Sequence, residues 1–357
     1  MRSALPHRPA LVSRLRSLWR GSGGAMAALA AFMLTVAVGI TGAAVDVGLV
    51  VSTHNELQNA ADAAALAGAG TMLSFSQDGS QITAQTATGL LSAQQVALAN
   101  QAGGVNLALP DPDVTIGYYD LETDAFDLSR AGSSDPDDIT GFRATLRRDE
   151  TANGPVGTFF AGVVGLGSVD ISATSTAYLG WTGRVDPATA DIPLAIHASA
   201  LQNAGSPDCG TELAFNNEAS ESAEWTSFFT WPTNDNTVRG FMDGTSQSPA
   251  MQVGEQLNVI NGNLSVATME ALAGRFQAEG IDSDGDGAAD SWEVVVPVVN
   301  PGSSSTVSTV TGFATLVLTE ADGGHARFYL QCDRAIVGST SGGGDYGTRA
   351  TLPSLIQ

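Results

Sequence analysis

The sequence predicts an α+β protein carried on one long N-terminal helix, and three observations support this fold class. Residues 21–45 contain no charged side chain, and the segment that follows to residue 70 is rich in alanine and free of proline. Stretches further along the chain alternate apolar and polar residues, as half-buried strands do. A helix-like segment precedes the first group of these stretches, so we expect helices packed on a small antiparallel sheet.

The apolar run at residues 25–45 is 21 residues long. A transmembrane helix needs roughly 20 apolar residues to cross a hydrocarbon layer of about 30 Å. Residues 25–70, taken as one helix, would be about 70 Å long at 1.5 Å per residue, so less than half fits in lipid. We therefore predict a single-pass anchor helix at 25–70 whose second half leaves the membrane and packs on other parts of the protein.

The charges that flank this run predict its orientation. Arginines precede the run and no acidic residue does, which places residues 1–24 as a basic cytoplasmic tail and exports the rest. The alternative is a cleavable signal peptide cut near residues 41–43. The apolar run is longer than the usual 7 to 15 residues of such peptides, which favours a retained anchor. The arginines are Arg2, Arg8, Arg14, Arg16 and Arg20.

The segment after the apolar run resembles a known family. Asp46 is followed at a set distance by the Asn-Ala-Ala-Asp run of residues 59–62. This combination resembles the N-terminal segment of TadG/TadE-like proteins of the Flp (tight-adherence) pilus, and residues 159–177 and 314–355 are similar to their C-terminal parts. The resemblance implies a pilin-like long helix, an inner-membrane anchor and other pilus-assembly proteins as partners.

Two features depart from that family's patterns. Members cut by a prepilin peptidase carry a glutamate five residues after the cleaved glycine, whereas cutting after Gly24 would place Leu29 there. Some relatives carry an Asp-x-Ser-x-Ser metal motif, and the nearest match here begins at Asp170, ends in Thr174 and lies in a strand-like pattern. Prepilin processing and that metal site are therefore not expected.

The composition limits the function classes. The formal net charge is −22, and all 37 acidic residues follow the apolar run. Such a surface repels nucleic acid and favours cation binding. The sequence contains no lysine, which excludes a Walker P-loop and a lysine Schiff base. The Gly-rich stretch at 342–347 opens no predicted helix, and the four histidines are scattered. No nucleophile elbow is present, so we predict no enzyme and no small-molecule substrate.

The first exported unit is predicted at residues 71–180. A turn at 74–82 and a helix at 84–101 lead to strands at 114–119, 139–148 and 169–179. A short apolar segment at 156–164 reads as a helix, and residues 181–193 as a linker.

A second α+β unit is predicted at residues 194–357. Its helix at 265–279 has Ser265 as N-cap and Met269, Leu272 and Phe276 on one face. Its strands are predicted at 196–201, 212–215, 293–299, 310–319 and 327–337, with a hairpin turn at 320–324. The aromatic stretch at 225–231 is read as core rather than as a ligand platform.

One loop in this unit fits the twelve-residue calcium pattern. Acidic residues stand at the diagnostic positions, Gly287 permits the sharp turn, and the sixth ligand would be a backbone carbonyl. A strand follows the loop, so we expect a structural Ca²⁺ at extracellular concentration rather than a helix-loop-helix sensor. The alternative is an acidic turn without an ion. The predicted ligands are Asp282, Asp284, Asp286, Ala288, Asp290 and Glu293.

The two cysteines, Cys209 and Cys332, lie in the exported part, where oxidation is permitted, and are predicted to form a disulfide. Together these features predict a non-catalytic structural or assembly component of a Flp pilus, stabilised by calcium. The alternative is an exported, calcium-dependent adhesion or binding module that shares the anchor.

Overall fold

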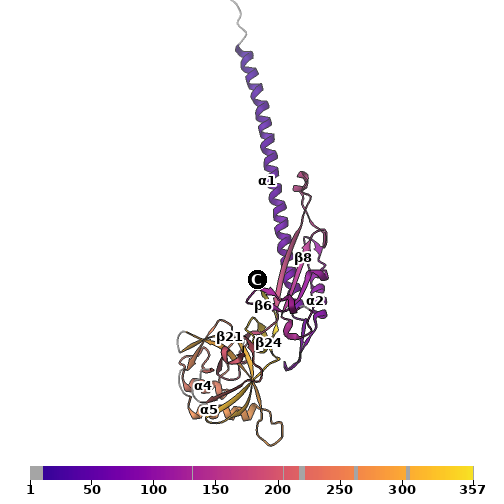
Figure 1. The fold of residues 1–357 in the computed structure, drawn as a ribbon. Coiled ribbons are helices and arrows are strands. Elements are labelled where there is room, and N and C mark those ends of the chain that lie inside the picture. The colour runs from indigo at the N-terminus through magenta and orange to yellow at the C-terminus, as the bar shows by residue number, and fades with distance from the viewer. Residues whose placement is uncertain are drawn as a thin grey trace, which may run out of the picture.

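A single helix dominates the shape of the molecule. The computed structural model describes residues 11–130, 132–203, 205–216, 222–260, 264–302 and 306–356. Helix α1 (Leu11–Ala69) projects from two folded parts that lie beside its C-terminal end (Figure 1). It begins before the predicted start at residue 25, so the predicted tail is helical from Leu11 onward. The first ten residues of that tail lie outside the described residues.

The first folded part packs the end of α1 and helix α2 (Thr86–Leu98) on a four-stranded antiparallel sheet. The strand order is β25-β11-β8-β5, and the core between sheet and helices contains Leu57, Phe142 and Leu146 together with α1 alanines. The strands are β5 (Val114–Gly117), β8 (Gly141–Arg148), β11 (Ile171–Tyr178) and β25 (Ser354–Ile356).

Short hairpins and 3₁₀ turns connect these elements. The hairpins are β1 (Leu73–Phe75) with β2 (Ile82–Ala84), β3 (Gln101–Ala102) with β4 (Val105–Asn106), β6 (Tyr119–Asp120) with β7 (Ala125–Phe126), and β9 (Val156–Gly157) with β10 (Ser168–Val169). The 3₁₀ turns are η1 (Asp111–Asp113), η2 (Leu128–Arg130), η3 (Pro136–Asp138) and η4 (Ala161–Val164).

The second folded part is built on a seven-stranded sheet of order β16-β22-β21-β19-β17-β13-β20. Because β20 also pairs with β21, five of these strands (β21, β19, β17, β13 and β20) close on themselves, and β22 and β16 extend the sheet from β21. The strands are β13 (Leu194–His197), β16 (Glu212–Asn216), β17 (Ala223–Thr226), β19 (Gln256–Ile260), β20 (Trp292–Pro301), β21 (Val307–Ala321) and β22 (His325–Gln331).

Helices α4 (Asp235–Met242) and α5 (Val266–Glu279) add apolar side chains to the core of this sheet. The Ser265 side chain accepts the Thr268 N–H and so caps α5, while Met269, Leu272 and Phe276 are buried, as the sequence predicts. A second sheet has the order β18-β12-β23-β24. The remaining elements are α3 (Ala198–Leu201), β12 (Thr182–Val185), β14 (Gln202–Asn203), β15 (Ser206–Pro207), β18 (Met251–Gln252), β23 (Arg334–Ser341) and β24 (Thr348–Leu352).

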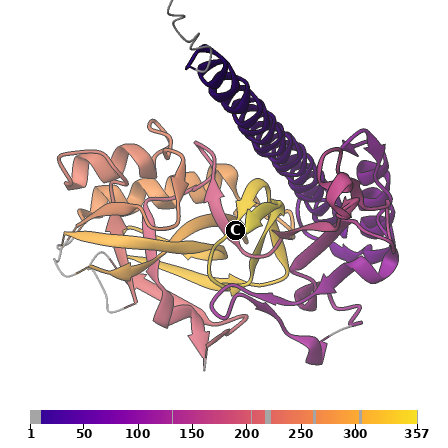
Figure 2. The ribbon, with the colours of Figure 1, turned by 90° about the horizontal axis from the view of Figure 1, so that it is seen from above.

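The two parts lie side by side, indigo to magenta and pink to yellow in Figure 2, and the chain crosses between them twice. After the second part is complete, β25 returns to pair with β11, with Thr176 opposite Ile356 and Tyr178 opposite Ser354. The predicted α+β class is confirmed. The pairing of β25 with β11 could not be predicted from a local sequence pattern.

Four local predictions are wrong. Of the strand predicted at 196–201 only Ile196 and His197 belong to β13, and Ala198–Leu201 form helix α3. The predicted linker at 181–193 contains β12, and Val185 and Ile192 are buried, because this segment supplies a strand to the second sheet. The segment at 156–164 begins as strand β9 and only ends as a 3₁₀ turn. The strand predicted at 327–337 is broken between β22 and β23, where Asp333 takes a positive φ of 58°.

Gly68 tests how closely α1 approaches the sheet. A Cβ at this position would overlap the ring of Phe142, which is fully buried. Overpacking a filled core typically costs about 1–3 kcal/mol. We expect Gly68→Ala to lower the free energy of unfolding by about that amount in urea titrations.

The matched control is Gly274→Ala in α5, where an added Cβ meets no atom within 4 Å. That change should raise stability by a few tenths to about 1 kcal/mol through helix propensity. Equal effects of the two substitutions would contradict close packing at Gly68.

Candidate functional site

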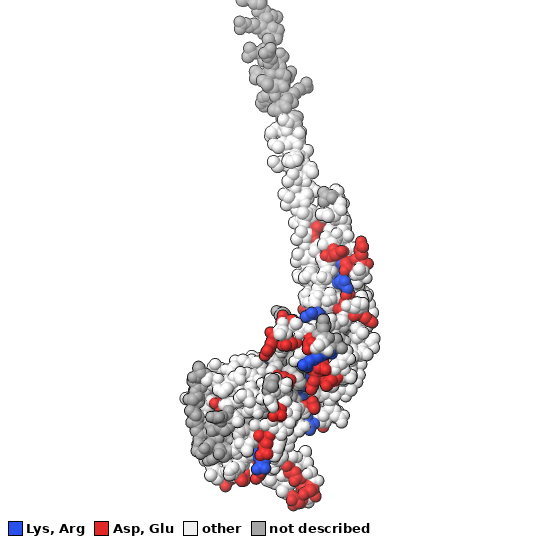
Figure 3. All heavy atoms as spheres, in the orientation of Figure 1, with Lys and Arg blue, Asp and Glu red and all other residues white. Residues whose placement is uncertain are grey.

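The acidic loop lies between α5 and β20 and protrudes at the end of the molecule far from the free end of α1 (orange, bottom of Figure 1). Its base is closed by backbone hydrogen bonds, from Ile281 N–H to the Ser291 carbonyl at 2.7 Å and from Asp290 N–H to the Ile281 carbonyl at 2.8 Å. Figure 3 shows acidic side chains gathered at this tip. The loop is thus a defined projection held by its own base.

Three of the predicted ligands converge. The side chains of Asp282, Asp284 and Asp290 are exposed, and one carboxylate oxygen from each lies within 4.8 Å of the others. Backbone N–H groups hold them: Asp282 accepts from Gly285 at 2.6 Å and from Gly287 at 2.9 Å. The Ser283 hydroxyl and N–H both donate to Asp290 and lower the pKa of that carboxyl below its ordinary value. Such a set of oxygens is the kind that Ca²⁺ takes.

The other predicted ligands lie apart from this group. Asp286 accepts the Ala288 N–H at 2.8 Å instead of joining the three carboxylates. Glu293 belongs to β20, and its carboxylate forms an ion pair with Arg334 at 3.2 Å. For Glu293 to complete a twelve-residue calcium site, its ion pair with Arg334 would have to break.

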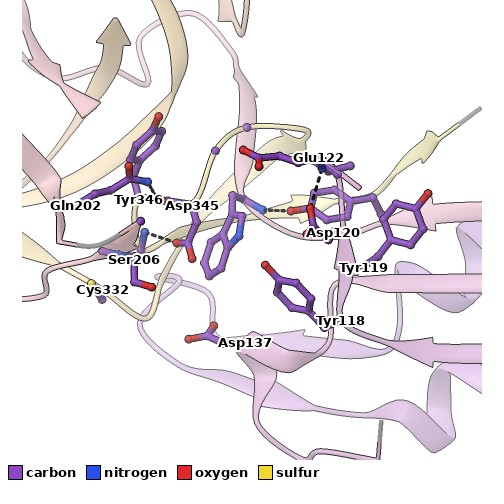
Figure 4. A pocket seen from close by; sticks show the side chains of 18 of the residues that line it. Tyr118, Tyr119, Asp120, Glu122, Asp137, Gln202, Ser206, Cys332, Asp345 and Tyr346 are labelled. Carbon is purple, nitrogen blue, oxygen red and sulfur yellow. Dashed lines mark hydrogen bonds between the residues drawn. The ribbon is translucent and has the colours of Figure 1, made fainter. Parts of the chain in front are cut away.

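A wide cleft of about 680 Å³ lies between the two folded parts. Figure 4 shows its lining side chains, among them Tyr118 from the first part and Asp345 and Tyr346 from the second. Arg130 stacks over the Tyr118 ring at 4.1 Å. Among the residues described along this cleft none is a histidine, and its two cysteines, Cys209 and Cys332, form the disulfide. The described lining of the cleft is mainly acidic and aromatic.

Arg349 joins the two parts next to this cleft. Its side chain is fully buried and donates to the Ile139 carbonyl at 2.8 Å, to the Leu179 carbonyl at 3.0 Å and to the Asp137 carboxylate at 3.1 Å. Its guanidinium also lies 4.9 Å from the centre of the Trp181 ring. Arg349 belongs to β24, and its three hydrogen-bond acceptors belong to the first part. Because leaving a buried charge unpaired is costly, these bonds fix the position of β24 against the first part.

The aromatic stretch divides into two pairs. Trp225 and Phe228 are buried in the core, as expected, whereas Phe229 is 40% exposed and Trp231 is 79% exposed. The exposed indole is therefore available for contact with another molecule.

Asp46, which directly follows the apolar run, makes a contact that the sequence did not predict. Asp46 is buried, and its carboxylate accepts the N–H groups of Phe159, Phe160 and Ala161 at 2.8, 2.9 and 2.6 Å. The sequence marks Asp46 as the first acidic residue after the apolar run and as part of the family-like motif, but predicts no partner for its carboxylate. No local pattern predicts this contact, because Asp46 and Phe159 are 113 residues apart in the sequence.

Two family models match this chain. The Flp pilus-assembly TadE/G-like model matches residues 23–71, and the Tad-like Flp pilus-assembly model, Tad_C, matches residues 67–177. The predicted resemblance is confirmed over this region, whereas residues 314–355 lie outside both matches. No curated protein and no solved structure matches the chain.

Asp345 provides a pH test of the cleft. It is half-buried, and this burial raises its pKa from 3.8 to about 6, although it accepts the Gly347 N–H at 3.1 Å. Because the pKa of Asp345 is raised in the folded state, the protonated carboxyl contributes fully to stability below pH 3.8. This contribution is lost as the pH rises through about 6. We expect Asp345→Asn, which keeps an acceptor for Gly347, to stabilise the protein by roughly 1–3 kcal/mol at pH 7.5.

The gain should shrink toward zero at pH 3.5, where the wild-type carboxyl is already protonated. Urea unfolding at both pH values measures it, with Asp170→Asn at an exposed carboxylate as the control. A gain of the same size at both pH values would show that charge burial is not its cause.

Proposed function

We propose, from the match of residues 23–177 to two Flp pilus-assembly families, that this protein is a membrane-anchored, non-catalytic component of a Flp pilus apparatus. The matches support a role in Flp pilus assembly. The proposal adds that α1 holds the protein in the inner membrane and that the folded parts contact other pilus-assembly proteins.

The exposed surface of α1 is the observation that carries the proposal. From Ala25 onward α1 is long and apolar enough to cross a membrane, and the part of this stretch that stands clear of the folded parts is drawn without charged side chains in Figure 3. Water would solvate this surface poorly, whereas lipid tails suit it. The large apolar side chains that are exposed there are Met26, Leu29, Phe32, Met33, Leu34, Val36, Val38 and Ile40.

The same helix supports an assembly role rather than a purely anchoring one. Its C-terminal half is the central element of the first core, so force or movement applied to the membrane segment reaches the sheet without a flexible joint. The arginines before the span support a cytoplasmic N-terminus and export of the folded parts. The disulfide between Cys209 and Cys332 fits an oxidising compartment.

Deletion of the gene from the native host tests this function. We expect cells without the protein to lose surface Flp fibres, and the full chain to restore them. A chain with residues 1–45 replaced by a cleavable signal peptide should not restore them, because export is kept while the anchor is lost. The measurement is electron microscopy of fibres together with carbonate extraction of membranes.

Normal fibres in the deletion strain would contradict an assembly role. Normal fibres combined with lost attachment to surfaces would favour the second candidate, an exported adhesion or binding module. The exposed Trp231 favours that candidate, and Trp231→Ala separates the two by affecting attachment alone.

We also propose that the acidic loop binds a structural Ca²⁺. The convergence of Asp282, Asp284 and Asp290 supports this. With a dissociation constant near 10⁻³ M, 10 mM Ca²⁺ would add about 1.4 kcal/mol to stability. We expect the melting temperature to rise by roughly 3–6 °C in calorimetry, and less in Mg²⁺.

Asp282→Asn with Asp284→Asn should abolish this rise. Asp322→Asn is the matched control, because Asp322 is also an exposed turn carboxylate that accepts the N–H groups of Gly324 and His325. A calcium shift that persists in the double variant would place the ion elsewhere.

A further inference from the structure

The loop between β9 and β10 exposes an unusual number of apolar side chains. Phe159 is 77% exposed, Val163 85% and Leu166 64%. Residues 151–169 contain no charged residue, although the protein as a whole is strongly acidic. Single exposed apolar residues are common, but a contiguous set on one loop marks an interaction surface.

This loop lies against α1 at the end of the apolar run and rises along the helix in Figure 1. Asp46 accepts three of its backbone N–H groups, and Gly42 is buried beneath Phe160, where any Cβ would overlap the ring. If residues 25–45 span the hydrocarbon layer, Gly42 lies about 5 Å inside its boundary at 1.5 Å per residue. The loop is therefore held at the depth of the membrane interface.

The loop also satisfies much of its own backbone. Irregular backbone near lipid is tolerated only where its polar groups have partners. Inside the loop, Thr158 N–H donates to the Gly167 carbonyl at 3.1 Å and Leu166 N–H donates to the Ala161 carbonyl at 3.0 Å. The three N–H groups at the start of the 3₁₀ turn η4, those of Phe159, Phe160 and Ala161, donate to Asp46, so the tip of the loop presents mainly apolar side chains.

We propose that residues 157–168 form a second membrane contact, which inserts its apolar tip among the lipid acyl chains beside α1. The lipid is the occupant because the loop continues the lipid-facing surface of α1, carries no charge and reaches the 5–10 Å depth typical of interfacial segments. Two contacts fix the depth and tilt of α1 and hold the folded parts against the membrane surface. This inference rests on the proposed anchoring by α1.

Fluorescence quenching in vesicles tests it. The full chain with Val163→Cys, labelled with an environment-sensitive dye, is reconstituted in phosphatidylcholine vesicles that contain spin-labelled lipid. We expect a blue-shifted emission and strong quenching. Leu166→Cys is a second probe in case Val163→Cys folds poorly. Val337→Cys is the matched control, because Val337 is an exposed valine of β23, far along the chain from the loop, and should not be quenched.

Phe32→Cys, in the middle of the apolar run, separates the two proposals. Quenching at Phe32 without quenching at Val163 or Leu166 would overturn the loop contact and leave the anchor intact. Absence of quenching at Phe32 would overturn both. Crosslinking of Val163 to a protein in native membranes, with no quenching in vesicles, would also overturn the lipid contact.

Two further variants test the geometry. Gly42→Ala should displace Phe160 and reduce quenching at Val163, whereas Gly39→Ala, whose Cβ meets nothing within 4 Å, should not. Asp46→Ala should reduce quenching in the same way, by freeing the three N–H groups. Unchanged quenching in both Gly42→Ala and Asp46→Ala would contradict a loop that α1 holds in place.

Discussion

The fold depends on the packing of one uninterrupted helix on a small sheet. Apart from Leu57, the residues that α1 contributes to the buried apolar core are alanines, so the backbone of the helix comes close to β8 and β11. Toward its N-terminus the same helix carries large apolar side chains that are exposed, from Met26 to Ile40. Along α1, small residues lie where the helix packs on the sheet, and large apolar residues lie where the helix is exposed. Asp46 lies between these two regions.

The second folded part is tied to the first by contacts that lie far apart in sequence. Arg349 reaches carbonyls at Ile139 and Leu179, and β25 completes the sheet that α1 covers. The first part therefore needs the last residues of the chain for its outer strand. The buried Arg349 and the sheet shared through β25 leave little freedom of movement between the two parts.

The charges are distributed along the length of the molecule. The apolar helix and the uncharged β9–β10 loop lie at one end, and the acidic loop with Asp282 and Asp284 protrudes at the other. Acidic groups also line the cleft between the parts, where burial raises the pKa of Asp345 to about 6. The exposed stretch of α1 from residue 25 to 45 thus contains no charged residue, while the opposite end of the molecule presents acidic side chains.

Several features follow from local patterns in the sequence. These are the long helix, the α+β class, the Ser265 cap of α5 and the presence of an acidic turn, because composition and periodicity over a few turns are enough to specify them. Other features emerge only when the chain folds: residues 181–193 contain a strand, Glu293 pairs with Arg334, and Asp46 holds the loop at Phe159. Asp46 and Phe159 are 113 residues apart. Such contacts depend on how distant segments pack against each other, and no local pattern carries that information.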